Sequence, residues 1–259
     1  MPSGQRLDEV VAEKAGVTRS RARSLIIAGR VRVDGRPLTK PGSTVRPSAV
    51  LDVARPRPYV SRGGEKLEAA LRDFELDVAG ARCLDVGAST GGFTDCLLAH
   101  GAAHVVALDV GYGQLAVALR EDPRVTVVER TNFRLLPDGA FGPEFDVVTI
   151  DASFISVVTL IARARAFLAR EGTVVALIKP QFEAGRERLG GGGVVRDPAV
   201  HRAILAETRA ASAALGLVPL AVTRSALRGP AGNVEFFLLA RRAGTAFDDA
   251  ALERAVGES

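Results

Sequence analysis

The chain has 259 residues, enough for one large α/β domain with a small appendage or for two ordinary domains. Apolar residues make up 47% of it, which is typical of a globular protein and excludes a disordered one. No stretch approaches the roughly 18 apolar residues that span a bilayer. The N-terminal sequence MPSGQRLDEVVAEKAG also lacks the apolar segment of a secretory signal, so we expect a cytoplasmic protein.

The two cysteines predict neither a disulfide nor a metal site. Cys83 lies in an apolar strand pattern and Cys96 in an apolar helix pattern. Neither has a CxxC partner or a histidine at ligand spacing, so we expect no metal.

Charge is distributed unevenly along the chain, although the net charge is only +4. Residues 1–62 hold 13 Lys or Arg against 5 Asp or Glu, a balance of +8, and the remaining 21 basic and 25 acidic residues give −4. A basic segment joined to a mildly acidic body indicates that the first segment meets a polyanion. A basic face that is simply solvated is the alternative.

Residues 1–53 predict a small α+β domain. RLDEVVAEKAG has helical spacing and ends at Gly16, and Thr18 can cap a second helix, TRSRARSLIIAG, which ends at Gly29. Short β segments with turn residues follow, namely VRVDG, RPLTKPG and STVRPSAVLDV.

The second predicted helix begins with Arg19, Arg21 and Arg23, where the helix dipole prefers anions. Phosphates would supply the missing negative charge. The stretch TRSRARSLIIAGRVRVDGRPLTKPG resembles the alpha-L type RNA-binding domain, which occurs in a small-subunit ribosomal protein, tyrosyl-tRNA synthetases and pseudouridine synthases. The resemblance implies that this domain binds structured RNA.

Residues 54–64, ARPRPYVSRGG, predict an extended linker, and residues 65–259 a second domain. Seven apolar strand patterns alternate there with helical stretches: RCLDVG, AHVVALDV, RVTVVE, FDVVTIDA, GTVVALIK, LVPLAVTRSAL and VEFFLLARR. This order predicts a doubly wound, mostly parallel sheet of the Rossmann-like kind. Ligands bind such sheets beyond the carboxyl ends of the strands.

The loop CLDVGASTGG predicts a cofactor site. An apolar strand ends in Asp85, and Gly87, Gly91 and Gly92 allow a tight turn around Ser89 before the next helix. A phosphate-binding P-loop would need a lysine after the glycines, and a dinucleotide site would show GxGxxG where this chain has GxxxGG. S-adenosylmethionine fits better, because it has no phosphate and its ammonium group can face Asp85.

The next two strand ends supply the rest of this signal. Asp109 ends VVALDV, where its carboxylate can accept both ribose hydroxyls of the cofactor, and Asn132 and Phe133 of RTNF can hydrogen-bond to and pack against the adenine. The alternatives are that Asp109 only caps a helix and that Asn132 only makes a turn.

Four charged residues occupy unexpected places. The chain has 30 arginines and four lysines, and Lys179 ends the apolar strand GTVVALIK. Asp151 ends the preceding strand, Glu235 lies in the apolar pattern NVEFFLLARR, and Lys66 begins the helix in SRGGEKL. An ammonium, unlike a guanidinium, can lose its proton near neutral pH. Four unrelated surface charges are the alternative.

With the cofactor loop, these four residues resemble the Lys-Asp-Lys-Glu set of the FtsJ-type RNA ribose 2′-O-methyltransferases. The whole chain resembles the TlyA family, historically labelled hemolysins, through VSRGGEKL, LDVGASTGGFTDCLL, RTNFR, DVVTIDASFIS, ALIKPQFEAG, GGGVVRDP and GNVEFF. The resemblance implies S-adenosylmethionine-dependent methylation of cytidine riboses in ribosomal RNA. The interdomain segment departs from the family pattern, because it lacks a tryptophan.

The implied chemistry gives each candidate catalytic residue a role. Lys179 would accept the proton of the 2′-hydroxyl or stabilise the forming alkoxide. Asp151 would orient Lys179, and Glu235 would pair with Lys66 or with the ribose. No metal is needed.

Further residues are predicted to meet the RNA, which we expect within ribosomal subunits. The candidate RNA contacts are Arg6, Arg19, Arg21, Lys40, Arg62, Arg130 and Arg134. Residues 185–198, GRERLGGGGVVRDP, predict a mobile lid, with a plain flexible loop as the alternative. A membrane-active hemolysin is the rival function, and it would need a secretion signal and a membrane-inserting segment.

Overall fold

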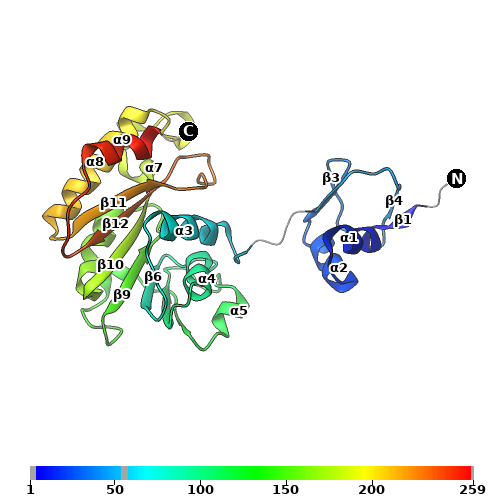
Figure 1. The fold of residues 1–259 in the computed structure, drawn as a ribbon, viewed down its shortest axis with the longest axis horizontal. Coiled ribbons are helices and arrows are strands. Elements are labelled where there is room, and N and C mark those ends of the chain that lie inside the picture. The colour runs from blue at the N-terminus through cyan, green and yellow to red at the C-terminus, as the bar shows by residue number, and fades with distance from the viewer. Residues whose placement is uncertain (1–3, 54–57, 258–259) are drawn as a thin grey trace. The chain divides into compact units, whose positions relative to one another are not determined.

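The computed structural model describes residues 4–53 and 58–257. The chain forms two compact units, Met1–Arg57 and Pro58–Ser259, which are described separately (Figure 1). Of the predicted linker, residues 54–57 lie outside the described part. The rest of it belongs to the second unit, because Tyr59 is buried and a helix begins at Arg62.

The first unit has two helices beside short antiparallel strands, as the sequence predicts. The helices are α1 (Leu7–Ala15) and α2 (Arg19–Ile27); the strands are β1 (Gln5–Arg6), β2 (Val31–Val33), β3 (Arg36–Pro37), β4 (Thr44–Val45) and β5 (Leu51–Val53). Strand β1 pairs with β4, and β2 lies between β3 and β5. Gly16 ends α1 with a φ of 62°, and the Thr18 hydroxyl accepts from Arg21 N. Leu7, Val11 and Ile26 centre a small core.

The second unit is a seven-stranded sheet in the order β11-β12-β10-β9-β6-β7-β8. The strands are β6 (Arg82–Val86), β7 (His104–Leu108), β8 (Val125–Val128), β9 (Phe145–Ile150), β10 (Leu168–Ile178), β11 (Val218–Arg224) and β12 (Phe236–Arg241). Neighbouring pairs are parallel from β8 to β10, and β12 runs antiparallel to both β10 and β11. The predicted seven-stranded, mostly parallel sheet is confirmed.

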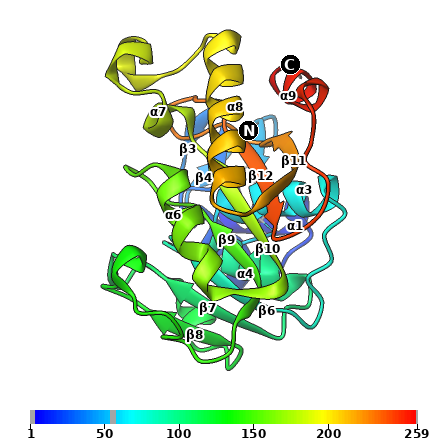
Figure 2. The same ribbon diagram turned by 90° about the vertical axis from the view of Figure 1, so that its left-hand side faces the viewer.

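Helices cover both faces of this sheet, which makes it doubly wound. They are α3 (Arg62–Asp73), α4 (Gly92–Ala99), α5 (Val117–Arg120), α6 (Val157–Ala164), α7 (Pro180–Glu183), α8 (Pro198–Ala214) and α9 (Asp249–Gly257). Figure 2 shows α6 and α8 over one face. Short 3-10 turns lie at Phe133–Leu135, Arg165–Phe167, Arg186–Arg188 and Gly191–Gly193.

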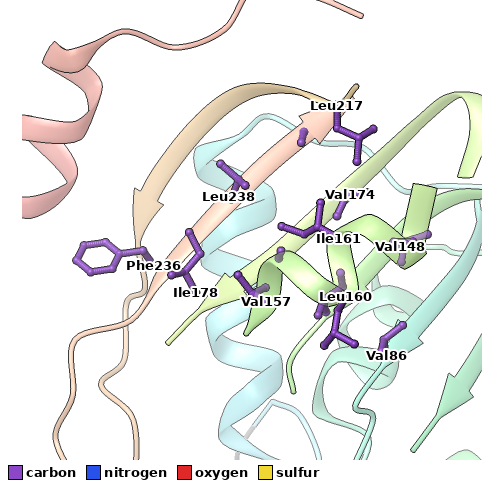
Figure 3. Packing of buried hydrophobic residues seen from close by; sticks show 14 of the residues in the cluster. Val86, Val148, Val157, Leu160, Ile161, Val174, Ile178, Leu217, Phe236 and Leu238 are labelled. Atoms are coloured by element: carbon purple, nitrogen blue, oxygen red, sulfur yellow. The ribbon is translucent and has the colours of Figure 1, made fainter. Parts of the chain in front are cut away.

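Strand residues alternate between the two cores. Ile178, Phe236 and Leu238 pack with Val157 and Ile161 of α6 on one face (Figure 3). Leu177 and Phe237, one position along, pack with α3 and α4 on the other face. This two-residue period explains why the central strands read as continuous apolar runs. It also makes a polar residue at a strand end stand out.

Candidate active site

A hollow of about 500 Å³ opens beyond the carboxyl ends of β6, β7 and β9. Such a volume is typical of a small-molecule site, and this edge is where doubly wound sheets bind ligands. Its lining includes five predicted cofactor residues, which are Gly87, Ser89, Asp109, Asn132 and Phe133. It also includes Arg134, predicted to meet RNA, and the candidate catalytic residue Asp151.

Asp109 joins the two loops that frame this hollow. Its Oδ2 accepts from Ser89 N at 2.8 Å and its Oδ1 accepts from Gly111 N at 2.7 Å. A carboxylate has about four acceptor positions, so two remain for a ligand. The carboxylate thus shapes the loop after β6 and can still receive two hydroxyl groups.

Asn132 and Phe133, at the same site, also stabilise the local structure. Asn132 Oδ1 accepts from Arg134 N at 3.1 Å and caps the 3-10 turn, as the turn alternative predicts, although its amide NH₂ group stays available. Phe133 is 2% exposed and packs against Phe167 with ring centroids 5.3 Å apart. Its ring therefore forms the wall between the hollow and the core.

Gly87 allows the loops after β6 and β9 to meet. Its φ is 87°, and a Cβ atom there would lie 2.5 Å from the Asp151 carbonyl oxygen. Gly91 and Gly92 serve packing instead. A Cβ at Gly91 would meet Leu119, and one at Gly92 would meet Ser61 Oγ at 2.2 Å and the Gly64 nitrogen at 2.9 Å. Gly92 thus lets the first turn of α3 approach the cofactor loop.

Asp85 lies beneath the loop rather than in the lining of the hollow. It is fully buried, and its carboxylate accepts from Thr94 Oγ1 at 2.7 Å and Thr149 Oγ1 at 3.0 Å. Burial raises the pKa of Asp85 to about 6, while the two hydroxyl donors oppose that rise. In this structure Asp85 supports the loop from below, so any effect on a cofactor ammonium is an electrostatic one through the loop.

The four candidate catalytic residues form two ion pairs. Lys66 Nζ lies 2.5 Å from Glu235 Oε2, with both side chains buried. Lys179 Nζ lies 2.6 Å from Asp151 Oδ1, with side chains 12% and 23% exposed. These are the partners that the sequence resemblance implies. Charges withdrawn from water, almost fully at Lys66–Glu235 and largely at Lys179–Asp151, cost desolvation energy, so their presence at this sheet edge points to function rather than stability.

Strand register explains how distant residues reach this edge. Asp151 follows the last residue of β9, Lys179 follows the last residue of β10, and Glu235 precedes the first residue of β12. Ile178 pairs with Phe236, and β9 pairs in parallel with β10, so the three charged residues leave adjacent strands at one edge. Helix α3 supplies Lys66 from the cofactor-loop side.

The sequence did not predict Ser153, a polar residue that contacts Lys179 in addition to the four candidate catalytic residues. Lys179 Nζ donates to Ser153 Oγ at 3.0 Å. Among the residues described, no aligned donor serves Asp151 Oδ1, which is buried and contacts Lys179 by charge alone. Ser153 follows Asp151 by two positions in DASF, and that proximity to a strand end was the available signal.

Phe154 was also missed. It is 91% exposed with a φ of 65°, and its ring lies 5.1 Å from that of Phe182. It lines the hollow beside Asp151. An aromatic residue in the apolar pattern TIDASFIS is expected to be buried in the core, so the sequence does not predict that Phe154 is exposed.

The candidate RNA contacts differ in how they are held. Arg6 and Arg19 both pair with the buried Asp8, at 3.0 and 3.2 Å, and Arg19 also pairs with Glu9. Helix α1 therefore supplies part of the negative charge that the sequence prediction assigned to phosphates. Arg6 chiefly, with help from Arg19, holds the pKa of Asp8 down at about 2.

The other candidate RNA contacts lie at the surface. Arg21 and Lys40 are exposed on the first unit, and no carboxylate of the described chain pairs with them. Arg62 donates to the Arg228 carbonyl at 2.7 Å, and Arg130 stacks on Tyr112 with 4.0 Å between guanidinium and ring centre. Arg134 is exposed at the rim of the hollow.

Within residues 4–53 and 58–257, no helix is long and apolar enough to cross a membrane. The same residues contain no cluster of His, Cys, Asp or Glu that could hold a metal ion. Cys83 and Cys96 are both buried free thiols.

The sheet order, the reversed β12 and the hollow beyond β6 and β7 define an α/β methyltransferase. A family description confirms this class: the FtsJ-like methyltransferase family matches residues 59–242, and the S4 domain matches residues 5–51. The chain belongs to the FtsJ-like methyltransferase family, in the TlyA branch, where this domain follows an S4 domain.

Known proteins agree with this assignment. The 16S/23S rRNA (cytidine-2′-O)-methyltransferase TlyA of Mycobacterium tuberculosis is 50% identical over 90% of this chain and 88% of its own. The structure of a protein named a hemolysin from Streptococcus thermophilus has a TM-score of 0.77 and 37% identity, covering 99% of this chain and 96% of that one.

A more distant structure supports the fold alone. An S-adenosylmethionine dependent methyltransferase from Mesorhizobium loti has a TM-score of 0.50 and 20% identity, over 67% of this chain and 96% of that one. The fold of the second unit is thus one that an S-adenosylmethionine dependent methyltransferase also adopts.

Proposed function

We propose that this protein transfers a methyl group from S-adenosylmethionine to the 2′-hydroxyl of a cytidine ribose in ribosomal RNA. The observation that carries the proposal is the pair of ion pairs, Lys66–Glu235 and Lys179–Asp151, at the sheet edge that also opens into the cofactor hollow. The similarity to the rRNA methyltransferase of M. tuberculosis supports the substrate. The S4 domain supports RNA over a small molecule.

The polar and apolar groups that line the hollow fit S-adenosylmethionine. Asp109 retains two acceptor positions for ribose hydroxyls, because each of its two oxygens accepts from one backbone donor. The Asn132 amide and the Phe133 ring form the far wall, where an adenine would meet a hydrogen-bonding edge and an apolar face. When bound, S-adenosylmethionine supplies an electrophilic methyl group on a sulfonium.

Lys179 has the geometry to act on the hydroxyl. Its ammonium is held between Asp151 and Ser153, two residues that line the hollow, so its position is set before substrate arrives. In the proposed mechanism, the Lys179 ammonium stabilises negative charge on the 2′ oxygen as the hydroxyl proton leaves for solvent, or Lys179 first releases a proton to solvent and then takes the hydroxyl proton as a neutral amine. Lys66 is paired with Glu235, so this second pair brings a donor and an acceptor to the same edge without net charge.

In the proposed mechanism, holding the 2′-hydroxyl and the methyl group in line supplies the rest of the rate enhancement. General-base help contributes about 10²–10⁴-fold, whereas holding nucleophile and electrophile in line reaches effective molarities of about 10⁵ M or more. The chain holds its four charged residues on strand ends and on α3, which are rigid elements.

The test uses the full chain, purified, with methyl-labelled S-adenosylmethionine and isolated ribosomal subunits. Label should enter ribosomal RNA and map to a cytidine whose 3′ phosphodiester resists alkaline cleavage, because a 2′-O-methyl group blocks that reaction. Lys179→Ala, checked for cofactor binding, should give no label. Label confined to small molecules or protein, or on a base rather than a ribose, would contradict the proposal.

A further inference from the structure

A second hollow, of about 390 Å³, lies in the same unit but outside the site already described. It is formed by the segment before α8, the first turn of α8, the connection between β11 and β12, and α9. Three arginines line it, which are Arg196, Arg224 and Arg228. None of them is among the residues predicted to meet RNA.

The arginines of this hollow are not paired with carboxylates in the described chain, although Arg228 donates to the Gly232 carbonyl and the Asp197 carboxylate lies close enough to His201 to act on it. No carboxylate is part of its lining, and across the described residues these three arginines form no ion pair. Nearby arginines behave differently: Arg188 pairs with Glu207 at 2.9 Å and Arg209 with Asp249 at 2.6 Å. Gathering three cations around one concavity costs repulsion, which a bound anion would offset.

A buried histidine forms part of the lining. His201 on α8 is 5% exposed, and its Nε2 lies 3.1 Å from the Val195 carbonyl, to which it donates. Burial lowers the pKa of His201 and outweighs the hydrogen bond to Val195, which raises it; Arg224 and Arg228 lower it further, against the opposing charge of Asp197. The imidazole is therefore a neutral group that adds no repulsion to the arginines, and its other nitrogen, Nδ1, makes no contact that the described residues supply.

This hollow adjoins the candidate catalytic residues through one short connection. Val234, which lines it, precedes Glu235 in the chain. The Arg228 carbonyl accepts from Arg62 at 2.7 Å, and a Cβ on Gly229 would lie 2.4 Å from Glu235 Oε1. A group bound by Arg224 and Arg228 is thus held by the same connection that carries Glu235.

We propose that this arginine pocket, defined by Arg196, Arg224, Arg228 and His201, binds a backbone phosphate of the RNA strand whose ribose is methylated. Guanidinium groups suit phosphate through paired, charge-assisted hydrogen bonds. Arg196 and Arg228 are exposed at the rim, open to a strand rather than closed around a small ion. The inference rests on the proposed function and adds an RNA contact that positions the strand beside Glu235.

The test compares Arg224→Gln/Arg228→Gln with a control that removes equal charge elsewhere in the unit. Arg72→Gln/Arg170→Gln serves as that control, because both arginines are largely exposed and neither lines the pocket. We expect the pocket variant to bind a short single-stranded RNA about tenfold less tightly for each lost contact, with the salt slope reduced by about 0.7 because one phosphate contact is lost. The control should match wild type.

Two further measurements separate the outcomes. The KM for RNA in methyl transfer should rise in the pocket variant by more than kcat falls, and Arg224→Lys/Arg228→Lys should restore most of the salt slope. Thermal melting and cofactor affinity establish that each variant is folded. An unchanged RNA affinity and salt slope in the glutamine variant would overturn the inference.

Inorganic phosphate distinguishes the source of the anion. If phosphate binds wild type and not the pocket variant, while RNA binds both equally, the pocket takes a free anion and the RNA assignment is wrong. RNA binding is measured without catalysis, so wild-type protein that binds RNA through this pocket but methylates no rRNA would contradict the proposed function alone.

Discussion

At the scale of single residues, Asp85 makes stability depend on pH. Its pKa in the folded chain is about 6, above its ordinary value of 3.8, so the folded protein keeps a proton that the unfolded chain releases. The stabilisation is therefore fully present below about pH 4 and is lost as pH rises through 6. The difference of about 2 pKa units corresponds to roughly 3 kcal/mol in the free energy of unfolding.

Asp85→Asn should abolish this loss because the amide does not titrate. We expect the free energy of unfolding of the wild type, relative to this variant, to fall by roughly 3 kcal/mol between about pH 4 and pH 7. Urea denaturation at several pH values measures it. Parallel profiles for the two proteins would show that Asp85 is ionised throughout.

Substitutions of Lys179 distinguish a role in proton transfer from a role of its positive charge alone. Lys179→Arg keeps a cation beside Asp151 and Ser153, whereas a guanidinium cannot act as a base near neutral pH and its planar fork does not place a charge where the ammonium lies. We expect about 10²–10⁴-fold slower single-turnover methyl transfer with saturating RNA and cofactor. Lys179→Ala should be at least as slow. Activity of the arginine variant within about tenfold of wild type would assign Lys179 a purely electrostatic role.

At the scale of elements, the contact between α3 and α4 couples packing to the active site. Gly92 on α4 faces the first turn of α3, where a Cβ would meet Ser61 Oγ and the backbone of Gly63 and Gly64. Gly92→Ala must push α3 away, at a cost of about 1–3 kcal/mol. Because α3 carries Lys66, we expect methyl transfer to fall further than the loss of stability explains. Gly257→Ala, where a Cβ meets nothing within 4 Å, is the control.

Equal losses of activity and folded protein in Gly92→Ala would contradict this coupling. The decisive comparison is the rate per folded molecule, with the folded fraction taken from thermal melting. A normal rate would mean that α3 moves without displacing Lys66 from Glu235.

The elements themselves were largely predictable, because buried strands leave a clear apolar pattern. All seven sheet strands and the two helices of the first unit appear where the sequence predicts them. Helix α9 was missed, and so was β1, whose two residues carry no apolar period. The ion pairs followed from a resemblance rather than from spacing, since Lys66 and Glu235 are 169 positions apart.

The roles of individual side chains were harder to predict from the sequence than the helices and strands. A glycine loop after a strand indicates a cofactor, but the pattern cannot distinguish Gly87, which lines the hollow, from Gly92, which serves helix packing. Asp85 and Asp109 both end strands, and only the fold shows that the first is buried beneath the loop. The arginine pocket joins Arg196 to residues about 30 positions later, a proximity that only tertiary structure creates.

At the scale of the whole molecule, the two units have separate cores and opposite charge. The core of the first unit comprises Leu7 to Leu51 and shares no residue with the two cores that cover the sheet. Residues 1–57 hold 12 Lys or Arg against 5 Asp or Glu, a balance of +7, and residues 58–259 carry −3. The first unit therefore attracts a polyanion that the second, taken as a whole, does not.

Removing residues 1–57 should leave a folded unit that binds S-adenosylmethionine with unchanged affinity, because the hollow and both sheet cores lie in residues 58–259. We expect it to methylate ribosomal RNA poorly, with a raised KM for the subunit. Its binding to RNA should also depend less steeply on salt, because Arg21 and Lys40, which we expect to contact phosphate, are gone. Calorimetry, methyl transfer and binding at several salt concentrations measure the three effects.

Equal salt slopes for both proteins would mean that the first unit does not contact phosphate. The arginine pocket and Arg134 would then have to supply the whole electrostatic attraction to RNA.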